Sequence, residues 1–173
     1  MEVGLLVLRV VVGAFFVGHG CRKLVGWFGG HGLPATGGAF EGMGLRPGRV
    51  MAALAGLSEV MGGVLLAVGF VTPLAAAMLI ATMTLAIAMV HWRHGPWVAV
   101  GGWEYNVVLI AVAFAVTAVG PGKYSVDHAL GWDLTGLDWA LIAAAVGVVS
   151  ALAIVAAARV TAADTGPARP AGA

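Results

Sequence analysis

The sequence predicts an all-α membrane protein, with a four-helix transmembrane bundle followed by a fifth, C-terminal hydrophobic helix. Of the 173 residues, 61% are hydrophobic and 10% are charged, whereas a soluble domain carries about 25% charged residues. Five apolar runs, separated by glycine, proline and charged residues, approach or reach the length of a membrane-crossing helix. The net charge of +1 indicates no nucleic-acid partner, so the lipid bilayer is the expected environment.

The first run extends from Val3 to Lys23. No basic residue precedes it and no small-residue cleavage site follows, so a retained span is expected and not a cleaved signal peptide. Arg9, His19 and Lys23 fall near one side of this helix. That side should face the bundle interior because a charge facing lipid is costly, although Lys23 can also snorkel to water from the helix end.

The segment 25–49 is rich in glycine and too polar to span the membrane. Trp27 and Phe28 are aromatic residues of the kind found at the headgroup level. Thr36 is the expected N-cap of a short amphipathic helix that continues through about Met43. This helix either covers a pocket as a lid or connects two spans along the membrane surface.

The second run, Val50–Val71, organises the rest of the chain because it carries a carboxylate, Glu59, near its middle. As a helix the run is about 33 Å long, which is enough to cross the bilayer core. A charge at that depth is costly unless it is paired, hydrated or protonated. We therefore expect another helix to bring a partner to Glu59, and the small residues around it allow a close approach.

The third run, Pro73–Val90, should form a tight antiparallel hairpin with the second, and Thr72 is its expected N-cap. Its end carries His91 and His94, which could share a metal, but no third ligand is suitably spaced. An interfacial cap is the preferred interpretation, and no metal site is predicted. Cys21 is the only cysteine, which excludes an internal disulfide and a cysteine-ligated metal cluster.

The fourth run opens with Trp103 and Glu104 and continues to Val119. A carboxylate in the first turn of a helix is favoured by the macrodipole, which is one explanation of Glu104. The fifth run, Leu137–Ala158, is expected to stop at Arg159.

The pattern divides the chain into three parts. These are a four-helix membrane domain (1–128), a connecting segment with the fifth transmembrane helix (129–160), and a tail (161–173) that is expected to be disordered. Lysine and arginine gather in the first loop, the third loop and the tail, whereas only Lys123 lies in the loops on the other side. The positive-inside rule therefore predicts that this multi-pass protein has its N-terminus outside and its C-terminus in the cytoplasm.

Depth along the helices brings the polar residues of the spans into one expected ligand-binding cluster that opens toward the cytoplasm. Glu59 lies between Arg9 and His19 in depth, and a pairing of Glu59 with Arg9 is the specific expectation. The cluster consists of Arg9, His19, Lys23, Glu59, Trp103 and Glu104. Intramembrane charges mark functional sites by default, but the same residues could form a structural lock that holds the helices in register.

Several motifs occur in order along the chain: Leu8-Arg9, Phe16-x-x-His19-Gly20, Lys23, Gly26–Gly30, Glu59-x-x-Gly62-Gly63, Gly102-Trp103-Glu104 and Gly120–Asp127. Together they resemble the DoxX family over about residues 4–128. The resemblance implies a four-helix bacterial inner-membrane protein related to the membrane subunit of archaeal thiosulfate:quinone oxidoreductase. It also implies that Arg9, His19, Lys23, Glu59 and Glu104 occupy family positions, and it does not extend to the fifth run.

Two functions stay open at this point. The first is a redox-linked membrane subunit whose polar cluster binds a quinone. A soluble partner protein would supply the electrons, because the sequence has no haem motif, flavin fingerprint or paired cysteines. The second is a non-enzymatic scaffold that holds a soluble redox or oxidative-stress enzyme at the membrane. Both are compatible with a homo-oligomer, and the sequence selects neither a substrate nor a partner.

Overall fold

The computed structural model describes residues 1–164, and the regular structure within them is entirely helical. Apart from short turns of π- and 3-10 helix, the elements are α1 (Glu2–Leu24), α2 (Gly32–Gly42), α3 (Gly48–Val68), α4 (Thr72–Ala86), α5 (Glu104–Val119), α6 (Val126–Ala129) and α7 (Leu137–Asp164).

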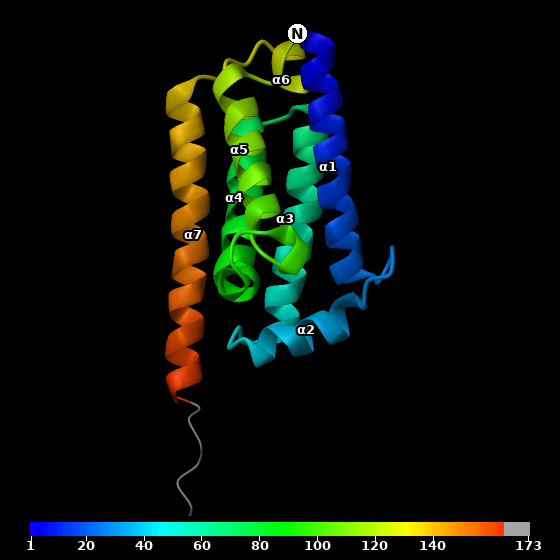
Figure 1. The fold of residues 1–173 in the computed structure, drawn as a ribbon. Coiled ribbons are helices and arrows are strands. Elements are labelled where there is room, and N and C mark those ends of the chain that lie inside the picture. Colours follow the sequence, from blue (N-terminus) through cyan, green and yellow to red (C-terminus); the bar gives the residue numbers. More distant parts are fainter. Residues whose placement is uncertain (165–173) are drawn as a thin grey trace, which may run out of the picture.

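The helices α1, α3, α4, α5 and α7 run side by side as an elongated bundle, with α1 and α7 on opposite sides (Figure 1). In this view the chain descends through α1, α4 and α7 and ascends through α3 and α5. The helix α2 lies across the lower end, whereas α6 lies at the upper end beside the N-terminus. These two ends of the bundle are called the α2 end and the α6 end below.

Four helical segments are long and apolar enough to cross a membrane: Glu2–Leu24, Gly48–Val68, Thr72–His94 and Leu137–Thr161. The remaining apolar helix, α5, has only 16 residues, a length of about 24 Å. Large apolar side chains point outward from the helices, as a lipid environment favours. The predicted all-α membrane fold is confirmed. The predicted fifth helix, α7, is one of the four segments that are long enough to cross a membrane.

Glycines bring α1 and α3 into close antiparallel contact. A Cβ atom on Gly13 would collide with the carbonyl oxygen of Gly63, and one on Gly20 would collide with that of Gly56. The two contacts lie two turns apart on each helix, so the backbones approach closely over this whole stretch. This register determines which side chains of α1 meet those of α3.

The hairpin between α3 and α4 turns at Gly69, whose φ of 66° places it in the left-handed region. Glycine adopts this conformation without steric strain. The amide of Phe70 donates to the carbonyl of Leu65 over 2.9 Å and so closes the C-terminus of α3. The predicted tight hairpin is therefore present.

The N-terminus of α4 is capped from a distant segment. Thr72, the predicted N-cap, is instead the first residue of the helix. The Asp127 carboxylate accepts hydrogen bonds from the amides of Val71 (2.7 Å) and Thr72 (3.0 Å) and from the Thr72 hydroxyl (2.7 Å). The side chain that satisfies the free N–H groups of α4 thus comes from α6, and the prediction for Thr72 is wrong.

Two other predicted boundaries are wrong. The surface helix begins at Gly32 and not after Thr36, because Pro34 suits a first helical turn. The last helix continues past Arg159 to Asp164, since an arginine near the end of a span can extend to the headgroups without interrupting the helix. The helix thus includes residues 161–164 of the expected tail, and residues 165–173 lie outside the described part of the chain.

The helix α7 packs against α4 and α5 through a seam of small residues. A Cβ on Gly147 would lie only 2.8 Å from the carbonyl oxygen of Ala77 on α4. The buried residues that the structure describes on α7 are Val155 and five small ones: Ala140, Ala143, Gly147, Ala151 and Ala158. Small side chains let helices approach within a membrane, where no hydrophobic effect drives them together.

Candidate functional site

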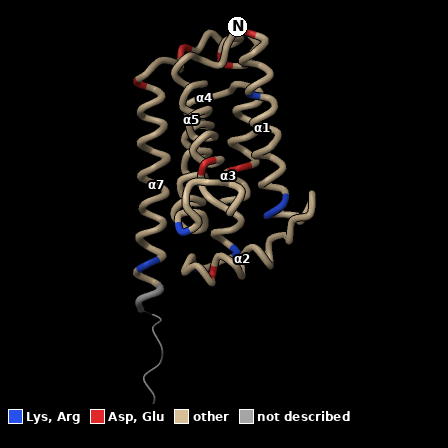
Figure 2. The backbone as a smooth tube through the Cα atoms, in the orientation of Figure 1, with Lys and Arg blue, Asp and Glu red and all other residues tan. Residues whose placement is uncertain are grey.

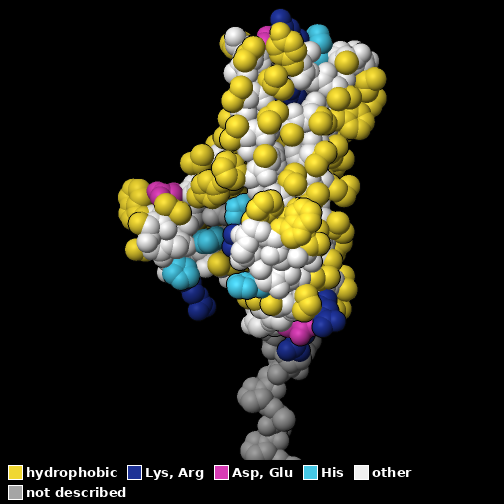
Figure 3. Space-filling model, turned by 90° about the vertical axis from the view of Figure 1, so that its right-hand side faces the viewer, with side chains coloured by type: hydrophobic (Ala, Val, Ile, Leu, Met, Phe, Trp, Pro, Cys, Tyr) yellow, Lys and Arg dark blue, Asp and Glu magenta, His cyan; other side chains and the backbone are white. Residues whose placement is uncertain are grey.

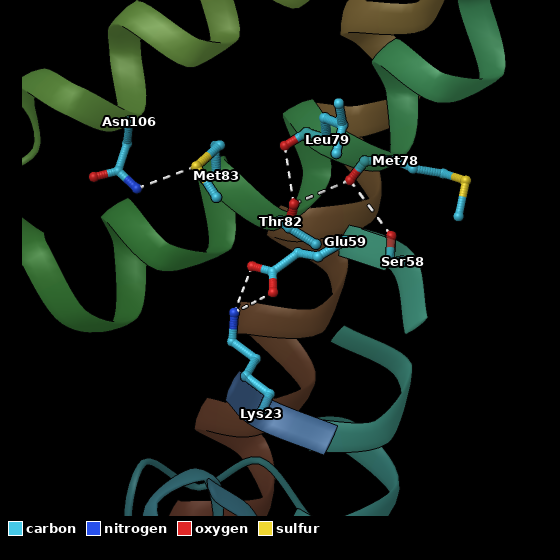
Figure 4. A network of polar contacts seen from close by, with 8 residues as sticks. All are labelled: Lys23, Ser58, Glu59, Met78, Leu79, Thr82, Met83 and Asn106. Atoms are coloured by element: carbon cyan, nitrogen blue, oxygen red, sulfur yellow. Dashed lines mark hydrogen bonds and ion pairs between the residues drawn. The ribbon is translucent and has the colours of Figure 1, made fainter. Parts of the chain in front are cut away.

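An ion pair lies inside the bundle where α1 faces α3. The Lys23 ammonium donates to both carboxylate oxygens of Glu59, toward which it extends from the α2 end (Figure 4). Only 3% of the Glu59 side chain is exposed, compared with 27% for Lys23. The expectation that the first helix would supply a partner to Glu59 is confirmed.

Arg9 is not that partner, and the direction of side chains on a helix explains why. Side chains tilt toward the N-terminus of their own helix. This tilt directs Glu59 toward the α2 end but Arg9, on the antiparallel α1, toward the α6 end. Lys23 lies beyond Glu59 near the α2 end and tilts back toward it. The predicted pairing of Glu59 with Arg9 is therefore wrong.

Arg9 belongs to a separate polar assembly at the α6 end. Its side chain is fully buried, and Nη2 donates to the carbonyl oxygen of Tyr124 over 2.6 Å. Its Nε and Nη1 have no hydrogen-bond partner among the described residues. Tyr124 lies just before α6, whose Asp127 caps α4, so this assembly ties α1, α4 and α6 together, which is a structural role.

A cavity of about 310 Å³, here called the polar cavity, lies beside the ion pair and between α1, α4 and α5. Its walls are mostly apolar, with Phe15, Phe16, Met83 and Leu109 among them. The side chains in its lining that carry polar groups are His19, Lys23, Glu59, His91, Tyr105 and Asn106. Figure 3 shows a hollow on this face of the molecule, with histidine side chains around it and a lobe projecting beside it.

Two of these polar side chains are buried, Glu59 and Asn106, and Asn106 is the less satisfied of the two. It is 6% exposed, and its Nδ2 donates to the thioether sulfur of Met83 over 3.4 Å. A thioether is a weak acceptor, and the amide oxygen accepts no hydrogen bond from the described residues. A buried amide in this state retains most of its hydrogen-bonding capacity for a ligand in the cavity.

One wall of the cavity is the loop of residues 91–104, here called the cavity loop. The helix α4 runs into it through a π-helical turn (Ile87–His91), and the turn places Val90 and His91 in the lining. Such turns are frequent at functional sites. Nδ1 of His91 lies 2.7 Å from the carbonyl oxygen of Gly101. Because a carbonyl can only accept, Nδ1 carries the proton in this contact.

Trp103 and Glu104 do not line the polar cavity but hold the cavity loop in place. Glu104 accepts a hydrogen bond from the backbone amide of Val98 over 2.8 Å. Trp103 stacks on Trp92, with ring centroids 6.5 Å apart and an interplanar angle of 18°. Of the six predicted site residues, the cavity thus brings together His19, Lys23 and Glu59.

Sequence reasoning did not assign Tyr105, Asn106 or His91 to the site. An asparagine in the first turn of an otherwise apolar run was the available signal for Asn106. Among the described residues, no group of three or more His, Cys, Asp or Glu side chains is arranged to hold a metal ion.

The arrangement defines a class: a helical multi-pass membrane protein with a buried ion pair beside an apolar cavity that carries a few polar groups. Within that class, residues 4–92 match the DoxX family, which is slightly more than half of the 173 residues. The chain belongs to the DoxX family. The match includes α1 to α4 and ends in the cavity loop, so it contains the ion pair but neither α5 nor α7. No curated protein and no solved structure matches the chain.

Proposed function

We propose that the polar cavity binds the ring of a quinone that enters from the bilayer, and that the protein is a redox-linked membrane subunit. The volume of about 310 Å³ lies at the lower end of the range for small-molecule sites. Mostly apolar walls with a few convergent polar groups suit a ring that has apolar faces and two carbonyl oxygens.

The donors that such a ring requires are present in the lining. Lys23 uses two of its three N–H groups on Glu59 and keeps the third. Asn106 offers an amide whose present partner is weak, and Tyr105 offers a hydroxyl. Glu59 would fix the position of the Lys23 ammonium, and His19 and His91 would place titratable groups at the same cavity.

A bound quinone would supply two-electron redox chemistry, for which a partner protein would provide the electrons. The residues of this chain would bind and orient the ring and hold proton donors near its oxygens. Lys23 Nζ is the donor best placed by its contacts, because the ion pair orients it inside the bundle.

The observation that carries the proposal is the buried, under-satisfied amide of Asn106 in an apolar cavity. We expect Asn106→Leu to weaken quinone binding about tenfold, the equivalent of one lost hydrogen bond. The melting temperature should stay the same or rise, because the side chain gives up only a weak contact with Met83. Tail-free benzoquinone binding and thermal unfolding of the purified protein in detergent measure the two effects.

Thr117→Val is the matched control on the same helix. Its hydroxyl donates to the carbonyl oxygen of Ala113 over 3.0 Å, away from the polar cavity, so the change should leave quinone binding unaltered. Equal affinity in wild type and Asn106→Leu, or no quinone binding by wild type, would overturn the proposal.

The projecting cavity loop favours a second candidate, a non-enzymatic scaffold for a soluble redox or oxidative-stress enzyme. Trp92 and Trp97 are 67% and 66% exposed on it, and large exposed aromatics suit either headgroups or a protein partner. Stable co-purification of a soluble enzyme with a protein that binds no quinone would select this candidate.

We further propose that the α2 end faces the cytoplasm of a bacterial cell. Lysine and arginine gather toward this end of the bundle (Figure 2). Arg22, Arg49 and Arg93 lie at the ends of spans there and Arg46 in a connection between two spans, whereas Lys123 lies in the connection near the α6 end. Under the positive-inside rule this distribution supports an external N-terminus.

A further inference from the structure

A second cavity, of about 410 Å³, lies in the cleft between α3 and α4. Ile154 of α7 and Phe40 of α2 contribute to its border. Three methionines line it, Met51, Met61 and Met78, and these flexible side chains adapt to irregular apolar ligands.

The hydroxyl groups of this α3–α4 cleft are already engaged by the protein. Thr82 donates to the carbonyl oxygens of Met78 (3.2 Å) and Leu79 (3.0 Å), and Ser58 points to the same Met78 carbonyl at 3.5 Å (Figure 4). The cleft also has no charged residue in its lining. Its chemistry therefore favours a purely apolar occupant.

A small cavity of about 90 Å³ lies between the cleft and the polar cavity. It shares five lining residues with the cleft: Phe40, Leu45, Ala55, Thr82 and Leu85. It shares Lys23, Glu59, Ala86 and Val90 with the polar cavity. Three consecutive spaces with common walls thus lead from the polar groups, past the ion pair, to the methionine-lined cleft.

We infer that the α3–α4 cleft is the binding site for the apolar chain of the ligand whose ring occupies the polar cavity. The chain would pass the ion pair along the apolar side chains of Ala86 and Val90. The inference rests on the proposed function, and it adds that the ligand class is a quinone with a long isoprenoid tail that the protein itself encloses.

The test compares a methoxy-substituted benzoquinone without a tail with the same ring bearing several isoprene units. At the ligand efficiency of a drug-sized molecule, each enclosed five-carbon unit is worth up to about tenfold in affinity. Wild-type protein in detergent should therefore bind the long-tailed quinone at least about tenfold more tightly. Ala55→Phe, which fills the common wall, should abolish this preference without changing the affinity for the tail-free ring.

Ala111→Phe is the matched control, because Ala111 is exposed on α5 and lines neither the cleft nor the small cavity. Ala111→Phe should still bind the long-tailed quinone more tightly than the tail-free one. Because all variants are measured in the same detergent, any difference in how the two quinones partition into it cancels when a variant is compared with wild type. Leu85→Trp narrows the same wall from α4 and replaces Ala55→Phe if that variant does not fold.

The outcomes separate the two proposals. If folded Ala55→Phe or Leu85→Trp protein still prefers the long-tailed quinone as strongly as wild type, the α3–α4 cleft does not bind the tail. The same conclusion follows if wild type binds the two quinones equally well. In both cases the proposal that the polar cavity binds the ring is unaffected. Failure of wild type to bind either quinone would overturn the proposed function and the chain site with it.

Discussion

Lys23 and Glu59 differ in what each can do once the other is removed. Lys23 is partly exposed near the end of α1, so its long side chain can turn toward headgroups and water. The Glu59 side chain, only 3% exposed, has no such route while the bundle stays closed. The carboxylate is therefore the partner that depends on the pair.

This asymmetry gives a prediction for the two single variants. Lys23→Met should lower the free energy of unfolding by about 3 kcal/mol, because it leaves a buried charge uncompensated. Glu59→Gln should cost only roughly 1 to 2 kcal/mol, since the freed ammonium can reach water. Equilibrium unfolding in mixed micelles measures both losses.

A double-mutant cycle tests the pairing itself. Lys23→Met combined with Glu59→Gln should cost less than the sum of the single losses by at least about 1 kcal/mol. Arg9→Gln combined with Glu59→Gln is the control and should be additive within about 0.5 kcal/mol, because Arg9 belongs to the α6-end assembly. Additive losses for the Lys23 and Glu59 variants would mean that the two are not coupled.

At the scale of the elements, the approach of α1 to α3 depends on glycines that sequence alone does not distinguish. Gly13 and Gly18 lie on the same helix, but only Gly13 faces the backbone of α3. A Cβ on Gly18 would have no neighbour within 4 Å. The two positions therefore form a matched pair.

Gly13→Ala should lower the free energy of unfolding by about 1 to 3 kcal/mol, because the new methyl group forces the helices apart. Gly18→Ala should be neutral or stabilising by up to about 1 kcal/mol, because alanine is the better helix former. Unfolding of the two variants under identical detergent conditions gives the comparison. Equal effects would mean that the α1–α3 contact is looser than described.

At the scale of the whole molecule, the descending helices α1, α4 and α7 alternate with the ascending α3 and α5, so the described chain ends lie at opposite ends of the bundle (Figure 1). Combined with the charge distribution, this arrangement predicts membrane topology. Reporter fusions at the C-terminus should score cytoplasmic, and insertions within residues 122–133 should score external. A cytoplasmic score at both sites would show that α7 does not cross the membrane.

Local properties of the sequence were sufficient to predict the long apolar helices, although not the short α6. Hydrophobicity and length identify membrane spans because a backbone in lipid must satisfy its own hydrogen bonds, which a helix does within one segment. The apolar runs of α5 and α7 were located in this way. The cost of a charge inside the membrane also predicted that the first helix supplies a partner to Glu59. Helix ends were less predictable, because the cap of α4 comes from Asp127, 55 residues from Thr72 along the chain.

The grouping of the polar residues depends on how the helices pack against one another. The expected single cluster divides into the Arg9 assembly, the Lys23–Glu59 pair, and Trp103 and Glu104, which hold the cavity loop in place. Arg9 and Glu59 separate because side chains at a similar depth on antiparallel helices point toward opposite ends of the bundle. Asn106 becomes a cavity residue through its position relative to Met83 and the ion pair, which no spacing along the chain encodes. The positions of the charged residues within apolar runs were enough to predict that this membrane protein buries charges. The packing of α1 against α3, set by the glycine contacts, decided which of them meet.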